Sequence, residues 1–236
     1  MAIAAAAAVL GAVASTLVIS ATGSVDLSDR AAIEKIVREY ILSHPEILPE
    51  AMENLRAQEL GKTVAANRAA IETPIGDAWD GAADADVTLV EFYDYACGYC
   101  RASIADIDRL LAEDKKLKIV YRDMPVLGDD SLEAARLSVA AALAGKFRAM
   151  HKPLYAAGRP SPELVDATRK RLGIDARALR APEIDRELAR NLTLQRQLDL
   201  SGTPAWVVGD KVLVGAVGYD ALKAAIAEAR AKAKSR

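Results

Sequence analysis

The two cysteines of this sequence stand three positions apart, and the 236 residues contain no others. They enclose the motif Cys97-Gly98-Tyr99-Cys100, which follows an apolar run and opens a segment with helical spacing. Such a pair can close a small disulfide ring, and a thiol at a helix N-terminus has a lowered pKa. We therefore expect Cys97 to be an exposed nucleophile and Cys100 to be the shielded, resolving thiol. The chemistry indicated is attack of a thiolate on another disulfide.

A metal site and a structural disulfide are the other interpretations of this motif. Zinc usually takes four ligands, and the two histidines, His44 and His151, are distant in sequence from the cysteines and from each other. We expect no metal. A structural disulfide across four residues would close little chain entropy and so stabilise little. We expect His44 at a helix end and His151 as a packing or surface residue.

The amino-acid composition favours a helix-rich protein that does not bind nucleic acid. Hydrophobic residues make up 52% of the chain but aromatic residues only 5%, which favours a helix-rich architecture. The formal net charge of −2 does not indicate a phosphate-binding surface, so no nucleic-acid partner is expected. The length suits one large domain, or a domain with an insertion.

Residues 1–24 are predicted to be a signal peptide or a membrane anchor. The stretch from Ala2 to Ala21 carries no charge, and the first charged residue is Asp26. Such a run fits the apolar core of an export signal and is also long enough to cross a bilayer. No Lys or Arg precedes it, so cleavage and retention both stay open. Export would place the thiols in an oxidising compartment.

A helical arm is predicted over residues 25–62. Apolar residues of the segment 31–43 recur at helical spacing, and a second helix is expected over 49–60. Residues 63–86, rich in Ala, Gly and Asp, are expected to be a linker. The two helices either pack on the main domain or associate with copies of themselves.

The rest of the chain predicts a sheet interrupted by helices. Strands are expected at Val87–Tyr93 and 117–122 with a helix over 101–111 between them, an order that implies a parallel pair. Residues 131–200 show a helical pattern. Two short strands (205–208 and 211–215) and a terminal helix (219–234) complete the chain.

The motif on its strand–helix joint resembles the DsbA-type branch of the thioredoxin superfamily. The resemblance implies an α/β class, with a thioredoxin fold formed by residues 87–128 and 201–236 and preceded by the helical arm. It also implies an inserted helical domain at 129–200. No cofactor is implied beyond a redox-active disulfide between Cys97 and Cys100.

The same resemblance implies further site residues. In Gly202-Thr203-Pro204 it places a cis-proline against the disulfide, with Thr203 and Pro204 contacting the substrate beside Gly98 and Tyr99. Glu91 would be a buried acid that exchanges a proton with Cys100. The alternatives are an ordinary trans turn at Thr203-Pro204 and a surface carboxylate at Glu91.

Residues 38–46 resemble the arm of the ScsC-like subgroup, some members of which oligomerise and act as disulfide isomerases. The expected protein is periplasmic, acts on cysteine-containing exported clients and is recycled by a membrane redox partner. The Gly98-Tyr99 dipeptide and Thr203 resemble those of isomerase-type members of the family, which implies isomerase or reductase activity. The alternatives are a DsbA-type dithiol oxidase and a non-enzymatic, membrane-tethered scaffold or copper-thiol binding protein.

Overall fold

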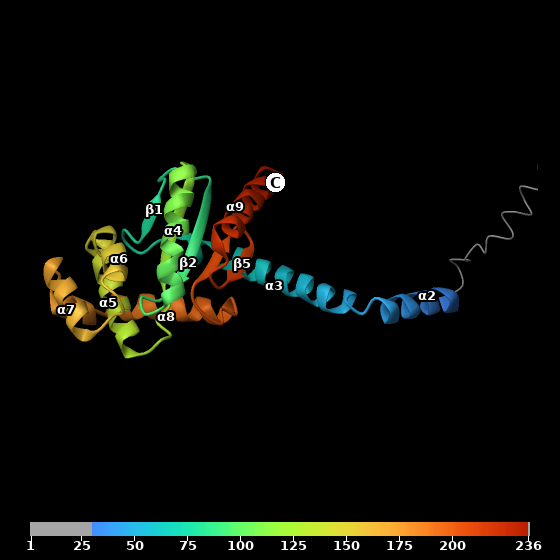
Figure 1. Cartoon of the computed structure of the whole chain (residues 1–236), viewed down its shortest axis with the longest axis horizontal. Helices are drawn as coiled ribbons and strands as arrows, with labels where there is room; N and C mark the ends of the chain where they lie inside the picture. The colour runs from blue at the N-terminus through green and yellow to red at the C-terminus, as the bar shows by residue number, and fades with distance from the viewer. Residues whose placement is uncertain (1–29, 236) are drawn as a thin grey trace, which may run out of the picture. The chain divides into compact units, whose positions relative to one another are not determined.

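The computed structural model describes residues 30–235, and the chain divides into two compact units, Met1–Leu55 and Arg56–Arg236 (Figure 1). The helices are α2 (Arg30–Ser43), α3 (Ile47–Glu72), α4 (Gly98–Glu113), α5 (Asp129–Leu143), α6 (Phe147–Ala156), α7 (Pro162–Arg171), the 3-10 helix η1 (Ala176–Arg180), α8 (Pro182–Gln197) and α9 (Gly218–Lys234). The strands are β1 (Trp79–Gly81), β2 (Val87–Tyr93), β3 (Leu117–Asp123), β4 (Ala205–Val208) and β5 (Lys211–Val214).

The first unit contains α2 and the beginning of α3. The predicted helix over 31–43 is confirmed, and it begins one residue earlier. None of the residues of α2 is buried. Large apolar side chains are exposed on both helices: Ile36, Val37, Tyr40, Leu42, Leu48, Met52 and Leu55. The predicted signal peptide or anchor at 1–24 lies outside the described residues, within which no helix is long and apolar enough to cross a membrane.

Helix α3 is longer than predicted, so the expected linker over 63–86 is wrong. The helix continues to Glu72, and its later residues belong to the second unit. Val64 and Ile71 are fully buried in one of the two apolar cores beside the sheet. Two buried apolar residues seven positions apart, in an alanine-rich segment, give too sparse a pattern to reveal a helix face.

The segment after α3 also contains an unpredicted strand, β1, which pairs antiparallel with β3. Three residues are too few to show the alternation that identifies a strand. Between α3 and β1 the chain passes close to α5 at Gly76. A Cβ added there would lie 2.1 Å from the Ala142 carbonyl oxygen, and φ is +49°, so this position requires glycine.

The five strands form one mixed sheet in the order β1-β3-β2-β4-β5. Strands β2 and β3 are parallel, as predicted, with α4 as their crossover. Strand β4 pairs antiparallel with β2, and β5 pairs antiparallel with β4. Both short strands lie where the sequence indicated, and β5 ends one residue earlier than predicted. The region 129–200 contains helices α5 to α8 and no strand, which confirms a helical insertion in a thioredoxin-like fold.

Strand β2 is buried on both faces of the sheet. Leu89 and Tyr93 belong to the core shared with α4, α9 and the inserted helices. Val90 and Phe92 belong to the opposite core, with α3 and the end of α8. Because side chains alternate along a strand, β2 contributes residues to both cores. Three residues separate its last residue, Tyr93, from Cys97.

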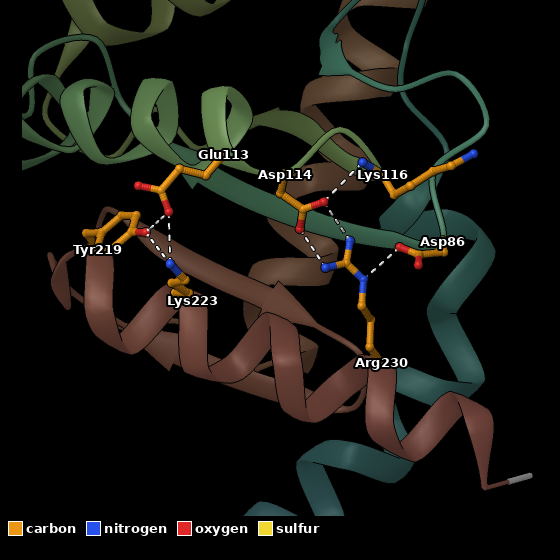
Figure 2. A network of polar contacts seen from close by, with 7 residues as sticks. All are labelled: Asp86, Glu113, Asp114, Lys116, Tyr219, Lys223 and Arg230. Carbon is orange, nitrogen blue, oxygen red and sulfur yellow. Dashed lines mark hydrogen bonds and ion pairs between the residues drawn. The ribbon is translucent and has the colours of Figure 1, made fainter.

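Helix α4, which follows Cys97, is anchored at its far end to α9 by a polar network (Figure 2). The guanidinium of Arg230 on α9 donates to both oxygens of Asp114 at 2.6 and 3.0 Å, and to Asp86 at 2.8 Å. Nearer the start of α9, Lys223 and Tyr219 both bond the Glu113 carboxylate. These contacts fix the direction of α4 and therefore the position of its N-terminus.

Arg122 joins three elements inside the second unit. It lies on β3 and is 2% exposed. Its Nη1 donates to Glu187 Oε1 at 2.6 Å and to Asn191 Oδ1 at 3.1 Å, both on α8. The remaining donors reach carbonyl oxygens at the end of α3: Ile71 at 3.0 Å, Ala70 at 2.5 Å and Thr73 at 2.5 Å. Since terminal helix carbonyls lack intrahelical partners, the guanidinium caps α3 and ties it to β3 and α8.

We expect Arg122→Met to lower the free energy of unfolding by about 3–5 kcal/mol, because it leaves the buried Glu187 carboxylate with only the exposed Arg190, 3.8 Å away, as its cation. The control is Arg186→Met on α8, whose guanidinium is 73% exposed and 4.0 Å from Glu183. Its expected effect is below about 1 kcal/mol. Urea denaturation followed by circular dichroism measures both variants, and equal losses would contradict the role assigned to Arg122.

Candidate active site

Cys97 is the N-cap residue of α4. Its backbone N–H donates to the Asp94 carbonyl at 3.0 Å, and its carbonyl accepts from Arg101 N–H at 3.2 Å. No side chain caps the helix, so the first amides of α4 keep their hydrogen-bonding capacity for a group at the Cys97 position. The predicted placement at a helix N-terminus is confirmed.

The two thiols are free, and both are buried. Cys97 is 6% exposed and Cys100 is 1% exposed. Shielding of Cys100 agrees with the sequence prediction, but the expected exposure of Cys97 is wrong. The reason is the neighbouring segment before β4, because the Cys97 Sγ donates to the carbonyl oxygen of Thr203 at 3.3 Å.

The pKa of Cys100 is raised well above its usual value. Burial is the main cause, and the negative charge of Glu91 adds to it. Hydrogen bonds from the Asp94 backbone and the Thr203 side chain to the sulfur offset part of the effect. Cys100 therefore holds its proton at neutral pH and needs a base before it can attack a disulfide.

Glu91 lies within β2, opposite Tyr121 of β3 and Trp206 of β4, and is 2% exposed. The alternative of a surface carboxylate is therefore wrong. Burial, followed by the nearby charge of Cys97, raises the pKa of Glu91 to about 8. A carboxyl group with such a pKa is able both to accept and to release a proton near neutral pH.

The Thr203–Pro204 peptide bond is cis, and the alternative of a trans turn is wrong. Thr203 is partly exposed and Pro204 is buried at the start of β4. The carbonyl oxygen of Thr203 accepts a hydrogen bond from the Cys97 thiol, and the Thr203 side chain acts to lower the pKa of Cys100.

The two residues between the cysteines face outward. Tyr99 is 70% exposed, and a Cβ added at Gly98 would meet no atom within 4 Å. The structure therefore brings Glu91, Cys97, Cys100 and Thr203 together and leaves Gly98 and Tyr99 at the surface beside them.

Two buried acids beside the site were missed by the sequence analysis. Asp94 follows β2 directly, and its Oδ1 accepts the N–H of Ala96 two residues on, at 2.8 Å. An Asp in this setting after a strand is a recognisable turn signal. Asp123 ends β3, where burial raises its pKa to about 8 and its Oδ1 has no hydrogen-bond partner. No sequence pattern distinguishes Asp123 from an ordinary strand-end acid.

His151 packs inside an aromatic cluster of the helical insertion. Its ring stacks on Phe147 with centroids 4.7 Å apart, and its Nδ1 lies 2.9 Å from the Tyr95 hydroxyl. Burial, with a smaller effect of Lys152, lowers the pKa of His151 to about 3. The ring is therefore neutral at physiological pH and packs as a core residue. Among residues 30–235 no three His, Cys, Asp or Glu side chains gather in a way that could hold a metal ion.

A buried pair of thiols at a helix N-terminus, beside a cis-proline and above a buried acid, defines a thiol–disulfide exchange site on a thioredoxin fold. Residues 88–227, more than half of the chain, match the model of the DSBA-like thioredoxin domain, and the chain belongs to this family of thiol–disulfide oxidoreductases. Residues 29–59 match the model of the copper resistance protein ScsC N-terminal domain.

Solved structures of thiol–disulfide exchange proteins are similar to this chain. A linker-deletion mutant of Proteus mirabilis ScsC has a TM-score of 0.70 at 26% identity, covering 89% of this chain and 99% of that one. A thioredoxin-like oxidoreductase from Silicibacter pomeroyi has a TM-score of 0.65 at 35% identity, covering 70% and 98%. The thiol–disulfide exchange protein alpha-DsbA2 from Wolbachia pipientis has a TM-score of 0.64 at 28% identity, covering 74% and 97%.

Among curated proteins, the Na(+)/H(+) antiporter NhaA 3 of Salinispora tropica is 31% identical over 165 residues, which are 66% of this chain. The match covers 25% of that protein. The chain thus spans about a quarter of the length of the curated relatives it matches.

We expect the stability of the reduced protein to fall as pH rises from 5 to 8. The unfolded chain releases the Glu91 proton near the ordinary pKa of 4.5, whereas the folded protein holds it until about 8. Between these values the folded state binds more protons, and each such group lowers stability by up to about 1.4 kcal/mol per pH unit. Asp123 contributes a second slope of the same sign. His151, whose pKa falls from 6.5 to about 3 on burial, contributes a slope of opposite sign below pH 6.5, which offsets only one of the two.

Between pH 6.5 and 8, Glu91→Gln should therefore remove about half of this slope, as measured by urea denaturation at a series of pH values. Glu163→Gln at the exposed start of α7 is the control, because a lowered pKa places its titration below the tested range. A wild-type slope in the Glu91 variant would show that this carboxyl group is ionised in the folded protein throughout.

Proposed function

We propose that this protein is an extracytoplasmic thiol–disulfide oxidoreductase that acts on protein disulfides as an isomerase or reductase. The observation that carries the proposal is the placement of Cys97 at the N-terminus of α4, with its Sγ 3.3 Å from the Thr203 carbonyl. An incoming chain that pairs with the Thr203 backbone would bring its own disulfide next to the Cys97 sulfur.

The first step forms a mixed disulfide. The Cys97 thiolate attacks one sulfur of the client disulfide, the client S–S bond breaks and the other client sulfur leaves as a thiolate. In the isomerase reaction, a different client thiol then attacks the mixed disulfide. This step restores Cys97 and leaves the client with a new disulfide, so no electrons are gained or lost overall.

In the reductase reaction, Cys100 resolves the mixed disulfide. The ionised form of Glu91, which is the minor form at physiological pH because the pKa is about 8, accepts the Cys100 proton. The resulting thiolate attacks the Cys97 sulfur, and the client leaves with both of its sulfurs reduced. The Cys97–Cys100 pair becomes a disulfide and loses the two electrons that the client disulfide gains. The buried position of Glu91, its pKa of about 8 and the raised pKa of Cys100 support this assignment. A membrane redox partner would then return the pair to the dithiol form.

The direction of the reaction is supported by the residues around the cysteines. The Gly98-Tyr99 dipeptide and Thr203 before the cis-proline are similar to those of isomerase-type members of the family. A DsbA-type dithiol oxidase is the alternative, and it would require the pair to be held as a disulfide in the cell. A non-enzymatic scaffold or copper-thiol binding protein is the alternative of another class.

The arm at residues 25–62 supports an oligomer, with exported, cysteine-containing proteins as clients. Its exposed apolar side chains include Val37 and Tyr40, which are 50% and 52% exposed. Apolar side chains that recur on a helix at this spacing are suited to packing against other helices. Several active sites in one oligomer could act on one misfolded client.

We expect Cys97→Ser to abolish insulin reduction and the recovery of scrambled ribonuclease, because this variant has no attacking thiol. Cys100→Ser should instead accumulate mixed disulfides that are visible on non-reducing gels. Ser103→Ala on α4, whose hydroxyl donates to the Tyr99 carbonyl at 3.0 Å, is the control and should keep wild-type activity. Full activity of the Cys97 variant would exclude the oxidoreductase function and leave only the scaffold or copper-binding alternative.

The direction is decided by two assays on the wild type. An isomerase restores scrambled ribonuclease when added in the reduced form, and its cysteine pair is found reduced in cells. Faster oxidation of reduced ribonuclease by the disulfide form, together with an oxidised pair in cells, would establish the oxidase instead.

The arm is tested by the mass of the full chain in light scattering. We expect an oligomer that dissociates in the variant Val37→Glu/Tyr40→Glu, because buried charges without partners oppose helix association. Glu39→Gln, an exposed residue on the same helix, is the control and should keep the oligomer. A monomeric wild type would remove the oligomer from the proposal.

A further inference from the structure

The carboxylate of Asp94 connects three segments that meet beside Cys97. Asp94 is the first residue after β2 and is 2% exposed. Each of its two carboxylate oxygens accepts two hydrogen bonds. Oδ1 accepts from Ala96 N–H at 2.8 Å and from Ser131 Oγ at 2.6 Å. Oδ2 accepts from Val126 N–H at 2.9 Å and from Leu127 N–H at 3.1 Å. These donors belong to the segment that leads to Cys97, to the 124–128 loop and to the first turn of α5.

Hydrogen bonds alone compensate for the burial of this carboxylate. Across residues 30–235, no Lys, Arg or His nitrogen lies within ion-pair distance of Asp94. Hydrogen bonds to an ionised acceptor are roughly twice as strong as neutral ones. Loss of the carboxylate would also leave the amides of Ala96, Val126 and Leu127 without this acceptor, which is costly inside a protein. The geometry of the three segments therefore depends on this one side chain.

The backbone of Asp94 reaches the cysteines directly. Its carbonyl oxygen accepts the N–H of Cys97 at 3.0 Å and the hydroxyl of Tyr155 at 3.1 Å. A shift of Asp94 would consequently move the N-cap of α4. The side chain sets the position of the 124–128 loop, and the main chain sets the position of Cys97, so the two are held at a fixed separation.

Exposed apolar side chains lie on the 124–128 loop and just after Cys97. Val126 and Leu127 are 41% and 44% exposed on the 124–128 loop, and Tyr99, two residues after Cys97, is 70% exposed. Exposed apolar residues on two segments beside a nucleophile form a surface that suits an apolar stretch of an unfolded polypeptide. A small disulfide such as oxidised glutathione has no such stretch.

We propose that Asp94 is a positioning residue that holds the 124–128 loop against the Cys97 segment, so that a polypeptide bound on Val126 and Leu127 presents its disulfide to Cys97. The inference rests on the proposed action on protein disulfides. It adds a residue whose side chain favours protein disulfides over small ones and bonds only to Ala96, Val126, Leu127 and Ser131, not to the reacting sulfurs.

The test compares two substrates in a Cys100→Ser background, in which Cys97 forms mixed disulfides that persist. The second-order rate of mixed-disulfide formation is measured with insulin and with oxidised glutathione. Addition of Asp94→Ala should lower the insulin rate about tenfold or more, because misplacement of a binding segment by about 1 Å can have effects of this size. The glutathione rate should stay within about threefold of its starting value.

Two further variants grade the effect. In Asp94→Asn the amide oxygen accepts two of the four hydrogen bonds, and the amide nitrogen faces the remaining donors. Ser131→Ala removes only the bond to α5. Both should lower the ratio of the insulin rate to the glutathione rate, by less than Asp94→Ala does. Asp130→Asn removes an exposed acid of α5 and is the control for charge, with an unchanged ratio expected.

Each outcome decides the inference. An unchanged ratio in the Asp94 variants, or equal losses with both substrates, would overturn it. Should Asp94→Ala fail to fold, as judged by circular dichroism, the ratios of Asp94→Asn and Ser131→Ala decide in the same way. The ribonuclease assays on the wild type report separately on the proposed function, since mixed-disulfide formation precedes both the isomerase and the oxidase outcome.

Discussion

The burial of β2 on both faces of the sheet is the constraint on which the site depends. Inside a protein, a polar group must be hydrogen-bonded, paired or neutral. Two acids at the end of this strand satisfy the requirement in different ways. Glu91 has a pKa of about 8 and so remains mostly neutral at physiological pH, while Asp94 is surrounded by hydrogen-bond donors. Glu91 in β2 thus carries an exchangeable proton, and Asp94 directly after β2 holds the neighbouring segments in place.

The remaining elements hold this strand and the helix after it in place. Arg122 ties α3 and α8 to the neighbouring strand, and Arg230 ties α9 to the end of α4. Both contacts lie away from the sulfurs. The Arg230 contact holds the far end of α4, and the Arg122 contact holds β3, the strand that pairs with β2. A reactive residue at a helix N-terminus is positioned only as well as the rest of its helix. Contacts distant from the cysteines, such as those of Arg122 and Arg230, therefore contribute to the geometry of the site.

Much of this architecture could be predicted from the sequence because its signals are local. The run Val87–Tyr93 and the cysteine spacing identified β2 and the start of α4, and the family resemblance located Glu91 and Thr203. The end of α3 could not be predicted, since Val64 and Ile71 become recognisable as core residues only when the sheet they cover is known. The same applies to Asp94, whose turn is a local signal but whose bonds to Val126, Leu127 and Ser131 depend on tertiary structure. The burial of Cys97 likewise arises from a segment more than 100 residues further along the chain.

The burial of Cys97 has a consequence for the lifetime of the protein. A thiolate open to solvent reacts with peroxides to a sulfenic acid, and further oxidation to the sulfinic and sulfonic acids is not reversed by simple thiols. With 6% and 1% exposure, the two sulfurs present little surface to such oxidants. A sulfenic acid formed on Cys97 would also meet Cys100 one turn away and could condense to a disulfide that a reductant can open. Burial beside the Thr203 segment thereby protects the attacking sulfur from irreversible oxidation.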